Sequence, residues 1–177
     1  MSRQETADLE ARSKTTKAPE ALVLALSLLP WAAYWLLTAG NDSAGTVVAL
    51  GISIALFAQQ VRSKLYRLLD VTSLAYFITA TAVTYSGVSR LFVDLAGPLS
   101  FGVLTAMAAG SLMARRPFSL YEARHAYPQP YWRNPAFVTL HNIVTTVWGG
   151  VFLLNTILLS FEAVSLTGPV PVGLMLA

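Results

Sequence analysis

Residues 136–161 read AFVTLHNIVTTVWGGVFLLNTILLSF and contain no Asp, Glu, Lys or Arg. A helix crosses the hydrocarbon layer of a bilayer with about 20 mostly apolar residues. This stretch is long enough to do so, and it predicts a transmembrane helix. Four further apolar runs lie between short blocks of Lys and Arg, and they predict spans over residues 21–38, 44–60, 68–87 and 91–114.

The fold class that follows is all-α, a polytopic transmembrane bundle of about five spans. Residues 1–20 are polar and predict a cytosolic arm, residues 21–161 form the membrane domain, and residues 162–177 form an apolar external tail too short to cross as a helix. The loop after the fourth span contains Ser119-Leu120-Tyr121-Glu122, which matches a capping box and predicts a short interfacial helix.

Composition agrees with a membrane protein. Charged residues make up 12% of the chain, hydrophobic residues 55%, and the mean hydropathy is +0.56. The absence of cysteine excludes disulfides, thiolate catalysis and thiolate metal sites. The net charge of +3 comes from basic groups that flank apolar segments, where they act as topology anchors, so we expect no nucleic-acid partner.

The basic residues also predict the orientation. The N-terminal arm, the loop after the second span and the loop after the fourth span together carry eleven Lys and Arg residues, whereas the opposite side carries only Arg90. The positive-inside rule therefore places the N-terminus in the cytosol and the C-terminus outside.

Small residues suggest where helices approach one another. Gly102, Ala106 and Gly110 recur every four residues in the fourth span, and Gly51 and Ala55 do so in the second. Such spacing is typical of helix-packing seams in membranes. We therefore expect these residues to carry helix–helix contacts.

A polar stripe follows one face of the fifth span, with His141, Thr145, Trp148 and Asn155 in helical register. Tyr76 lies in the third span, which is the richest in hydroxyl groups. Two interpretations stay open: interhelical hydrogen bonds, or a ligand face along a small-molecule path.

The loop after the fourth span carries Arg115, Arg116, Arg124 and Trp132, which suit contact with lipid headgroups. Aromatic residues of the first span, Trp31, Tyr34 and Trp35, are also expected near a membrane interface.

Few residues suggest catalysis or a cofactor. His125 and His141 do not predict a facing haem pair, and Asp70 and Asp94 fall near the ends of spans, where a structural or interfacial role is expected. No Walker loop, HExxH, GxSxG or Rossmann pattern occurs. We expect no enzyme activity, no metal and no cofactor.

The order of several short elements resembles the intracellular septation protein A family of bacterial inner-membrane proteins. The resemblance covers roughly residues 24–160 and rests on Leu29-Pro30, Val61-Arg62-Ser63-Lys64, Ala114-Arg115-Arg116-Pro117, Pro128-Gln129-Pro130-Tyr131-Trp132, and Asn142, Trp148 and Asn155 in the last span. It implies a bacterial inner-membrane protein linked to cell-envelope upkeep and division. It implies no catalytic residue.

The favoured hypothesis is a non-enzymatic membrane protein that acts through helix–helix and lipid contacts, as an envelope or division factor or an accessory subunit of a larger complex. Its partners would be membrane lipids and other membrane proteins or a second copy of the chain. A small-molecule or lipid transporter or binding bundle is the alternative, and a lipid-modifying enzyme is a third possibility.

Overall fold

The computed structural model describes residues 20–38, 42–64, 66–87, 95–123, 127, 132 and 134–166. These residues form six helices. The helices are α2 (Glu20–Thr38), α3 (Asp42–Ser63), α4 (Leu68–Ser86), α6 (Ala96–Met113), α7 (Phe118–Ala123) and α8 (Pro135–Leu166). The described chain is thus all-helical, as predicted.

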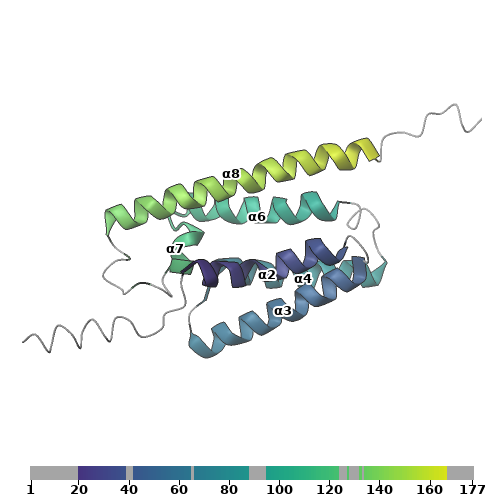
Figure 1. The fold of residues 1–177 in the computed structure, drawn as a ribbon, viewed down its shortest axis with the longest axis horizontal. Coiled ribbons are helices and arrows are strands. Elements are labelled where there is room, and N and C mark those ends of the chain that lie inside the picture. The colour runs from purple at the N-terminus through teal and green to yellow at the C-terminus, as the bar shows by residue number, and fades with distance from the viewer. Residues whose placement is uncertain are drawn as a thin grey trace, which may run out of the picture.

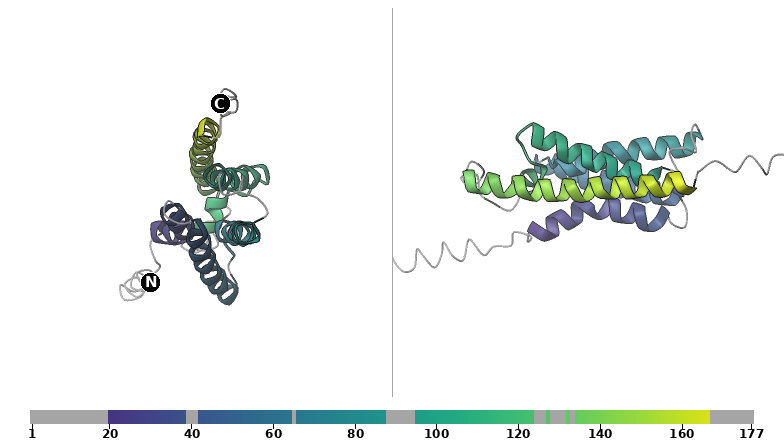
Figure 2. Two further views of the ribbon diagram at one scale, coloured as in Figure 1. Left: turned by 90° about the vertical axis from the view of Figure 1, so that its right-hand side faces the viewer. Right: turned by 90° about the horizontal axis from the view of Figure 1, so that it is seen from above.

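The five long helices run alternately up and down (Figure 1). End-on, they fall into two groups, with α2, α3 and α4 together, α6 beside α8, and the short α7 between the groups (Figure 2). The largest contacts agree, since α6 packs on α8, α2 on α3, and α3 on α4. The contacts between the groups, α4 with α6 and α7 with its neighbours, are smaller.

The observed helices overlap the predicted spans, with shifted ends. The helix of the fourth span begins at Ala96, and residues 91–94 lie outside the described residues. The fifth helix continues to Leu166, so the first residues of the expected tail are helical. The rest of that tail and the N-terminal arm before Glu20 lie outside the described residues.

Four helices are long and apolar enough to cross a membrane, namely Ser43–Ser63, Leu68–Ser86, Ala96–Met113 and Pro135–Ala163. The described apolar part of α2, Ala25–Thr38, is shorter. The chain is therefore a helical membrane protein.

Aromatic side chains of α2 form the centre of the core. Trp31 is fully buried, and its ring centroid lies 5.0 Å from those of both Tyr76 and Phe77 of α4. The Trp31 indole donates a 2.6 Å hydrogen bond to the Ser73 hydroxyl. Tyr34 is also buried, so the expectation that the Trp31 and Tyr34 rings face the membrane interface is wrong.

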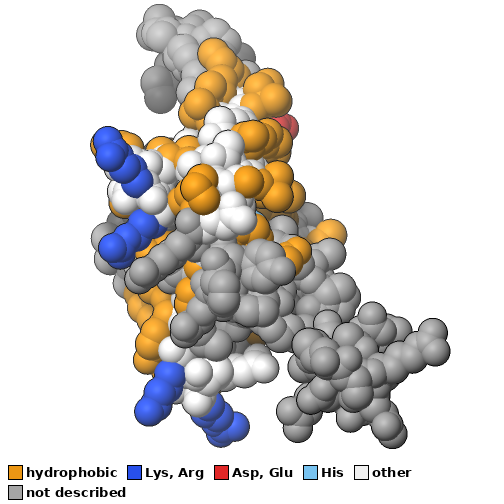
Figure 3. All heavy atoms as spheres, turned by 90° about the vertical axis from the view of Figure 1, so that its left-hand side faces the viewer, with side chains coloured by type: hydrophobic (Ala, Val, Ile, Leu, Met, Phe, Trp, Pro, Cys, Tyr) orange, Lys and Arg blue, Asp and Glu red, His pale blue; other side chains and the backbone are white. Residues whose placement is uncertain are grey.

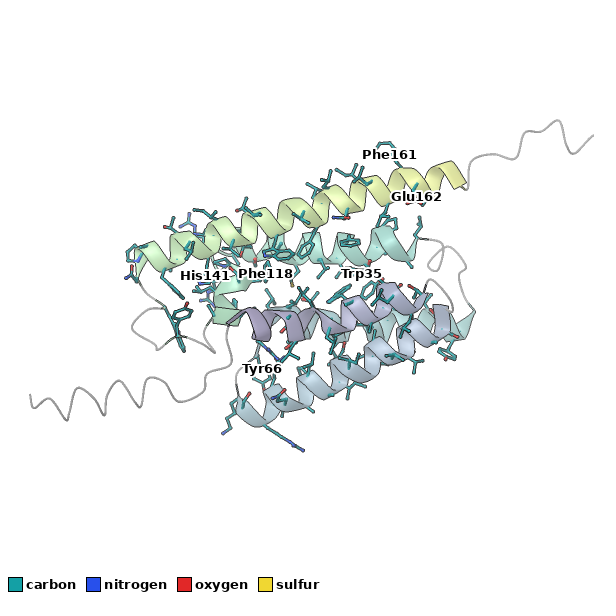
Figure 4. The ribbon with its side chains drawn as sticks, viewed as in Figure 1. Trp35, Tyr66, Phe118, His141, Phe161 and Glu162 are labelled. Carbon is teal, nitrogen blue, oxygen red and sulfur yellow. The ribbon has the colours of Figure 1, made fainter. Side chains whose placement is uncertain are left out.

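Trp35 connects the two groups of helices. Its ring stacks on Phe101 of α6 with centroids 4.5 Å apart, and its indole donates a 3.1 Å hydrogen bond to Ser100. The group α2–α3–α4 is thereby joined to α6 in the half of the bundle away from α7 (Figure 4). Aromatic stacking and a satisfied indole N–H together stabilise such a contact.

The closest approach between α6 and α8 needs glycine. A Cβ placed on Gly149 would stand 3.2 Å from the Ala108 Cβ, and one on Gly97 would stand 3.2 Å from the Leu159 side chain. The pairing of α6 with α8 therefore depends on small residues, as is common in membranes, but at positions other than the predicted seam.

Local hydrogen bonds define the start of α8 and the end of α6. Asn134 accepts a 3.0 Å hydrogen bond from the Ala136 amide and is therefore the N-cap of α8. At the end of α6, Arg115 adopts a left-handed conformation with φ of 55°, and the Arg116 amide donates to the Ser111 carbonyl at 2.9 Å. This Schellman-type turn directs the chain into α7.

The predicted short helix exists as α7, but the predicted capping box is wrong. Ser119 lies inside the helix, and its hydroxyl donates a 3.0 Å hydrogen bond to the His141 carbonyl of α8. The first amide of α7, that of Phe118, is satisfied by the Ser111 hydroxyl at 3.1 Å. All of α7 except Tyr121 is buried, so the helix is inserted between the two groups rather than lying on a surface.

The basic residues gather at one end of the bundle. Of the described residues, Arg62, Lys64 and Arg67 surround the α3–α4 connection, and Arg115 and Arg116 follow α6 at the same end. Figure 3 shows this end, with Lys and Arg side chains at its margin. The described basic residues that follow α3 and α6 thus lie at the same end of the bundle.

Candidate functional site

A buried ionic cluster lies at this basic end and joins four elements. Arg67 precedes α4, Asp70 lies in its first turn, and Glu122 comes from α7. The Arg67 Nε atom is 2.7 Å from Asp70 Oδ2 and 3.9 Å from Glu122 Oε2. The three side chains are exposed by 8%, 0% and 4% respectively. Lys, Arg, Asp and Glu are buried to this degree in proteins almost only as partners of one another.

Neutral polar groups complete the cluster. Gln60 of α3 donates to Asp70 through its amide nitrogen and accepts a 2.8 Å hydrogen bond from the Arg67 backbone amide. Ser27 of α2 donates to Glu122 Oε2 at 3.4 Å. The cluster therefore connects α2, α3 and α4 with α7.

The charges in the cluster do not balance when both carboxyl groups are ionised, because one guanidinium faces two carboxylates. Among the described residues, Asp70 Oδ1 and Glu122 Oε1 are buried without a hydrogen-bond donor. Burial, reinforced by the neighbouring Asp70 carboxylate and opposed by Arg67, raises the pKa of Glu122 to about 8. Glu122 is therefore mostly protonated at neutral pH, which leaves one buried ion pair, Arg67–Asp70.

A second polar contact anchors α7 to α8. His141 is buried, and its Nδ1 lies 3.1 Å from the Ser119 hydroxyl, which is also 3.0 Å from the Thr145 hydroxyl. The His141 ring packs edge-on against Phe137 with centroids 4.5 Å apart. His141 and Phe118 lie where α7 meets α8 (Figure 4).

The remaining residues of the predicted polar stripe do not gather into one site. Trp148 is half-buried and packs on Phe152, while Asn155 donates to the Val151 carbonyl of its own helix at 2.8 Å. Tyr76 belongs to the aromatic core and donates to the Ala96 carbonyl at 3.5 Å. Only His141 and Thr145 share a contact network.

The predicted small-residue seams make few close contacts with the chain's own helices. Nothing lies within 4 Å of a Cβ placed on Gly51 or Gly110, and a Cβ on Gly102 would meet Thr156 only at an ordinary 3.8 Å. Ala55 and Ala106 are exposed. Their role in packing against another molecule stays a prediction.

The predicted headgroup residues are placed as follows. Arg115 and Arg116 are exposed at the basic end, and within the described residues neither forms an ion pair. Trp132 is half-buried, and its indole donates a 2.9 Å hydrogen bond to the Tyr127 carbonyl. Arg124, His125, Arg90 and Asp94 lie outside the described residues.

A groove of about 580 Å³ opens between α4 and α6 and ends beside α7. Its lining combines apolar and small side chains with one guanidinium and one phenol. The lining residues are Leu68, Thr72, Val103, Ala106, Met107, Gly110, Ser111, Ala114, Arg116 and Tyr121. Two of the predicted seam residues, Ala106 and Gly110, thus line the groove.

Sequence reasoning missed the ionic cluster. The sequence predicts a structural or interfacial role for Asp70 and a capping role for Glu122, but it does not predict that both are buried against Arg67. A usable signal was the placement of Asp70 and Glu122 beside apolar spans in a chain with only nine acidic residues.

Comparison with known protein families, characterised proteins and solved structures finds no match to this chain. The resemblance to septation protein A therefore stays a prediction. In the described part of the chain no group of three or more His, Asp or Glu side chains is arranged to hold a metal ion.

Proposed function

We propose that the protein is a non-enzymatic membrane protein that acts through contacts within the bilayer, as an accessory or assembly factor for other membrane components. The observation that carries this proposal is the surface of α8. This helix covers Pro135–Leu166, yet only 11% of its most apolar stretch of 18 residues is buried against the rest of the chain. Its main contacts are with α6, and a smaller one is with α7.

The outer face of α8 is lined with large apolar side chains that only lipid or another helix can cover. Leu140, Ile143, Val147, Leu154, Leu158 and Phe161 are each more than half exposed. At about 1.5 Å per residue the helix is roughly 48 Å long, which exceeds the whole thickness of a bilayer. It therefore offers a surface for both lipid and protein contacts.

The outer face of α3 supports a protein contact more specifically. Gly51 and Ala55 lie on it one turn apart, between the exposed side chains of Val48 and Ile54. Inside the chain, glycines allow close helix approach at α6–α8, whereas the space above Gly51 is open. Small residues left open in this way favour a second helix from outside the chain.

The resemblance to septation protein A extends the proposal. By that resemblance the protein serves the envelope or division of a bacterium, in its inner membrane. The basic end of the bundle would face the cytosol by the positive-inside rule.

Native mass spectrometry of the protein extracted gently from its own membrane tests the proposal. The wild type should carry a second protein mass, another chain or a second copy, at fixed stoichiometry. The double variant Gly51→Leu/Ala55→Leu should lose that mass, whereas Ala82→Leu, at an exposed position on α4, should keep it. A wild-type protein that appears only as a bare monomer would refute the proposal.

The second candidate function is a lipid-binding bundle. The groove between α4 and α6 favours it, because that groove is lined by apolar side chains and ends beside cationic residues.

A further inference from the structure

The groove between α4 and α6 is suited to an apolar chain. Its walls are formed by Leu68, Val103 and Met107, and its width depends on Ala106 and Gly110. Nothing lies within 4 Å of a Cβ placed on Gly110, so a larger side chain there would project into free space along the groove.

The polar atoms of the groove walls are already engaged. The Thr72 hydroxyl donates to the Leu68 carbonyl at 2.9 Å. The Ser111 hydroxyl donates to the Ala108 carbonyl at 2.7 Å and accepts from the Phe118 amide. These walls leave little for a polar solute to bind, and they present methyl and methylene groups instead.

The length of the groove matches one leaflet of a membrane. From Val103 to its end at Met113, α6 rises by about 15 Å at 1.5 Å per residue. One half of the hydrocarbon layer measures about 15 Å. An acyl chain lying along this part of α6 would thus extend from the bilayer centre to the basic end of the bundle.

The end of the groove is cationic. Arg116 lines it together with Tyr121, and the exposed Arg115 precedes Arg116 in the turn between α6 and α7. Arg116 is exposed, so its guanidinium can be reached by an external anion. Guanidinium groups bind phosphate through paired hydrogen bonds, and a phenol can add another.

We propose that this groove binds a phospholipid with an anionic headgroup, whose acyl chain lies between α4 and α6 and whose phosphate contacts Arg116 and Tyr121. This inference rests on the proposed function, because it identifies a lipid among the bilayer contacts. The apolar walls of the groove bind the acyl chain of the lipid. The cationic end of the groove favours a headgroup with negative charge. Leu68 and Arg116 belong to segments adjoining the ionic cluster, so a bound lipid would contact both groups of helices.

Native mass spectrometry of the full chain from nanodiscs of equal parts phosphatidylglycerol and phosphatidylcholine tests the proposal. The wild type should retain one phosphatidylglycerol in preference to phosphatidylcholine. Arg116→Gln should lower that retention roughly tenfold, the loss typical of a single charge-assisted hydrogen bond. The matched control is Arg62→Gln, an exposed basic residue at the same end but outside the groove, which should retain the lipid.

A second variant tests the acyl chain. Gly110→Leu should fill the groove and abolish lipid retention, while Gly150→Leu, which also projects into open space but lies on α8, should not. Thermal unfolding of each variant establishes that it is folded.

Several results would overturn the lipid site. The first is equal retention of the two lipids by the wild type. The second is the same loss of lipid retention in Gly150→Leu as in Gly110→Leu. The third is displacement of the lipid by millimolar inorganic phosphate, which would identify a site for free phosphate. If Gly110→Leu removed a protein mass and left the lipid in place, the groove would be a helix-binding surface. The accessory role would then stand without the lipid site. The accessory role is tested separately, by whether the variant Gly51→Leu/Ala55→Leu loses the second protein mass.

Discussion

Replacing Glu122 with glutamine should change how the stability of the protein depends on pH. The pKa of Glu122 is about 8 in the folded protein, against an ordinary value of 4.5. Because the folded state holds this proton more tightly, its contribution to stability is fully present below pH 4.5. That contribution is lost progressively as the pH rises to about 8. Glutamine has nearly the same shape but carries no titrating proton.

The magnitude follows from the difference between the two pKa values. At 1.36 kcal/mol per pH unit, the wild type loses on the order of 5 kcal/mol between pH 4.5 and 8 through this group. Glu122→Gln should therefore match the wild type near pH 5. It should exceed the wild type by several kcal/mol at pH 9, which corresponds to roughly 10 °C or more in the midpoint of thermal unfolding.

Tryptophan fluorescence during thermal unfolding in one detergent, at pH 5, 7 and 9, measures the effect. Glu162→Gln, at an exposed glutamate on α8, is the matched control and is compared with the wild type at the same three pH values. A difference between wild type and Glu122→Gln that is the same at pH 5 and pH 9 would refute the reasoning. It would mean that Glu122 is ionised in the folded protein.

Three further substitutions test the packing. Arg67→Met leaves two buried carboxyl groups without their cation and should cost about 3–5 kcal/mol in the free energy of unfolding, measured by titration with SDS. Ser73→Ala removes the acceptor of the Trp31 indole and should cost about 1–3 kcal/mol in the same assay, and no change would show that the indole has another partner. Gly149→Leu should force α6 and α8 apart and lower the unfolding temperature, whereas Gly150→Leu, which meets open space, should not; equal effects would contradict the close approach at Gly149.

The helices themselves could be predicted because the information for them is local. An uncharged run such as residues 136–161 cannot be placed in water or in a loop at low cost, so its length alone predicts a span. The N-cap at Asn134 was predictable for the same reason, since it depends on two adjacent residues. The end of a span depends on more than its apolar length, and α8 continues past Glu162 to Leu166 because one exposed glutamate does not stop a helix.

The ionic cluster could not be predicted because its parts are distant in the chain. Glu122 lies far from Asp70 in sequence, and its spacing from Ser119 fits a helix cap equally well. The local sequence pattern therefore predicts a helix-capping contact with Ser119 instead of the contact with Arg67. The buried position of Trp31 could not be predicted for a related reason. An indole suits both a membrane interface and a buried site where its N–H has an acceptor. The acceptor here is Ser73, which belongs to another helix, α4.

The short helix α7 explains why the candidate sites lie at one end of the bundle. A helix of six residues is not stable by itself, so its neighbours must hold it in place. Glu122 faces the ionic cluster of α2, α3 and α4, Ser119 binds α8, and Tyr121 lines the groove. Because these side chains belong to a single rigid turn, the contacts of Glu122 and Ser119 also fix the position of Tyr121 beside Arg116. The ionic cluster and the groove thus share α7, because neighbouring residues of this short helix, Glu122 and Tyr121, belong to one and line the other.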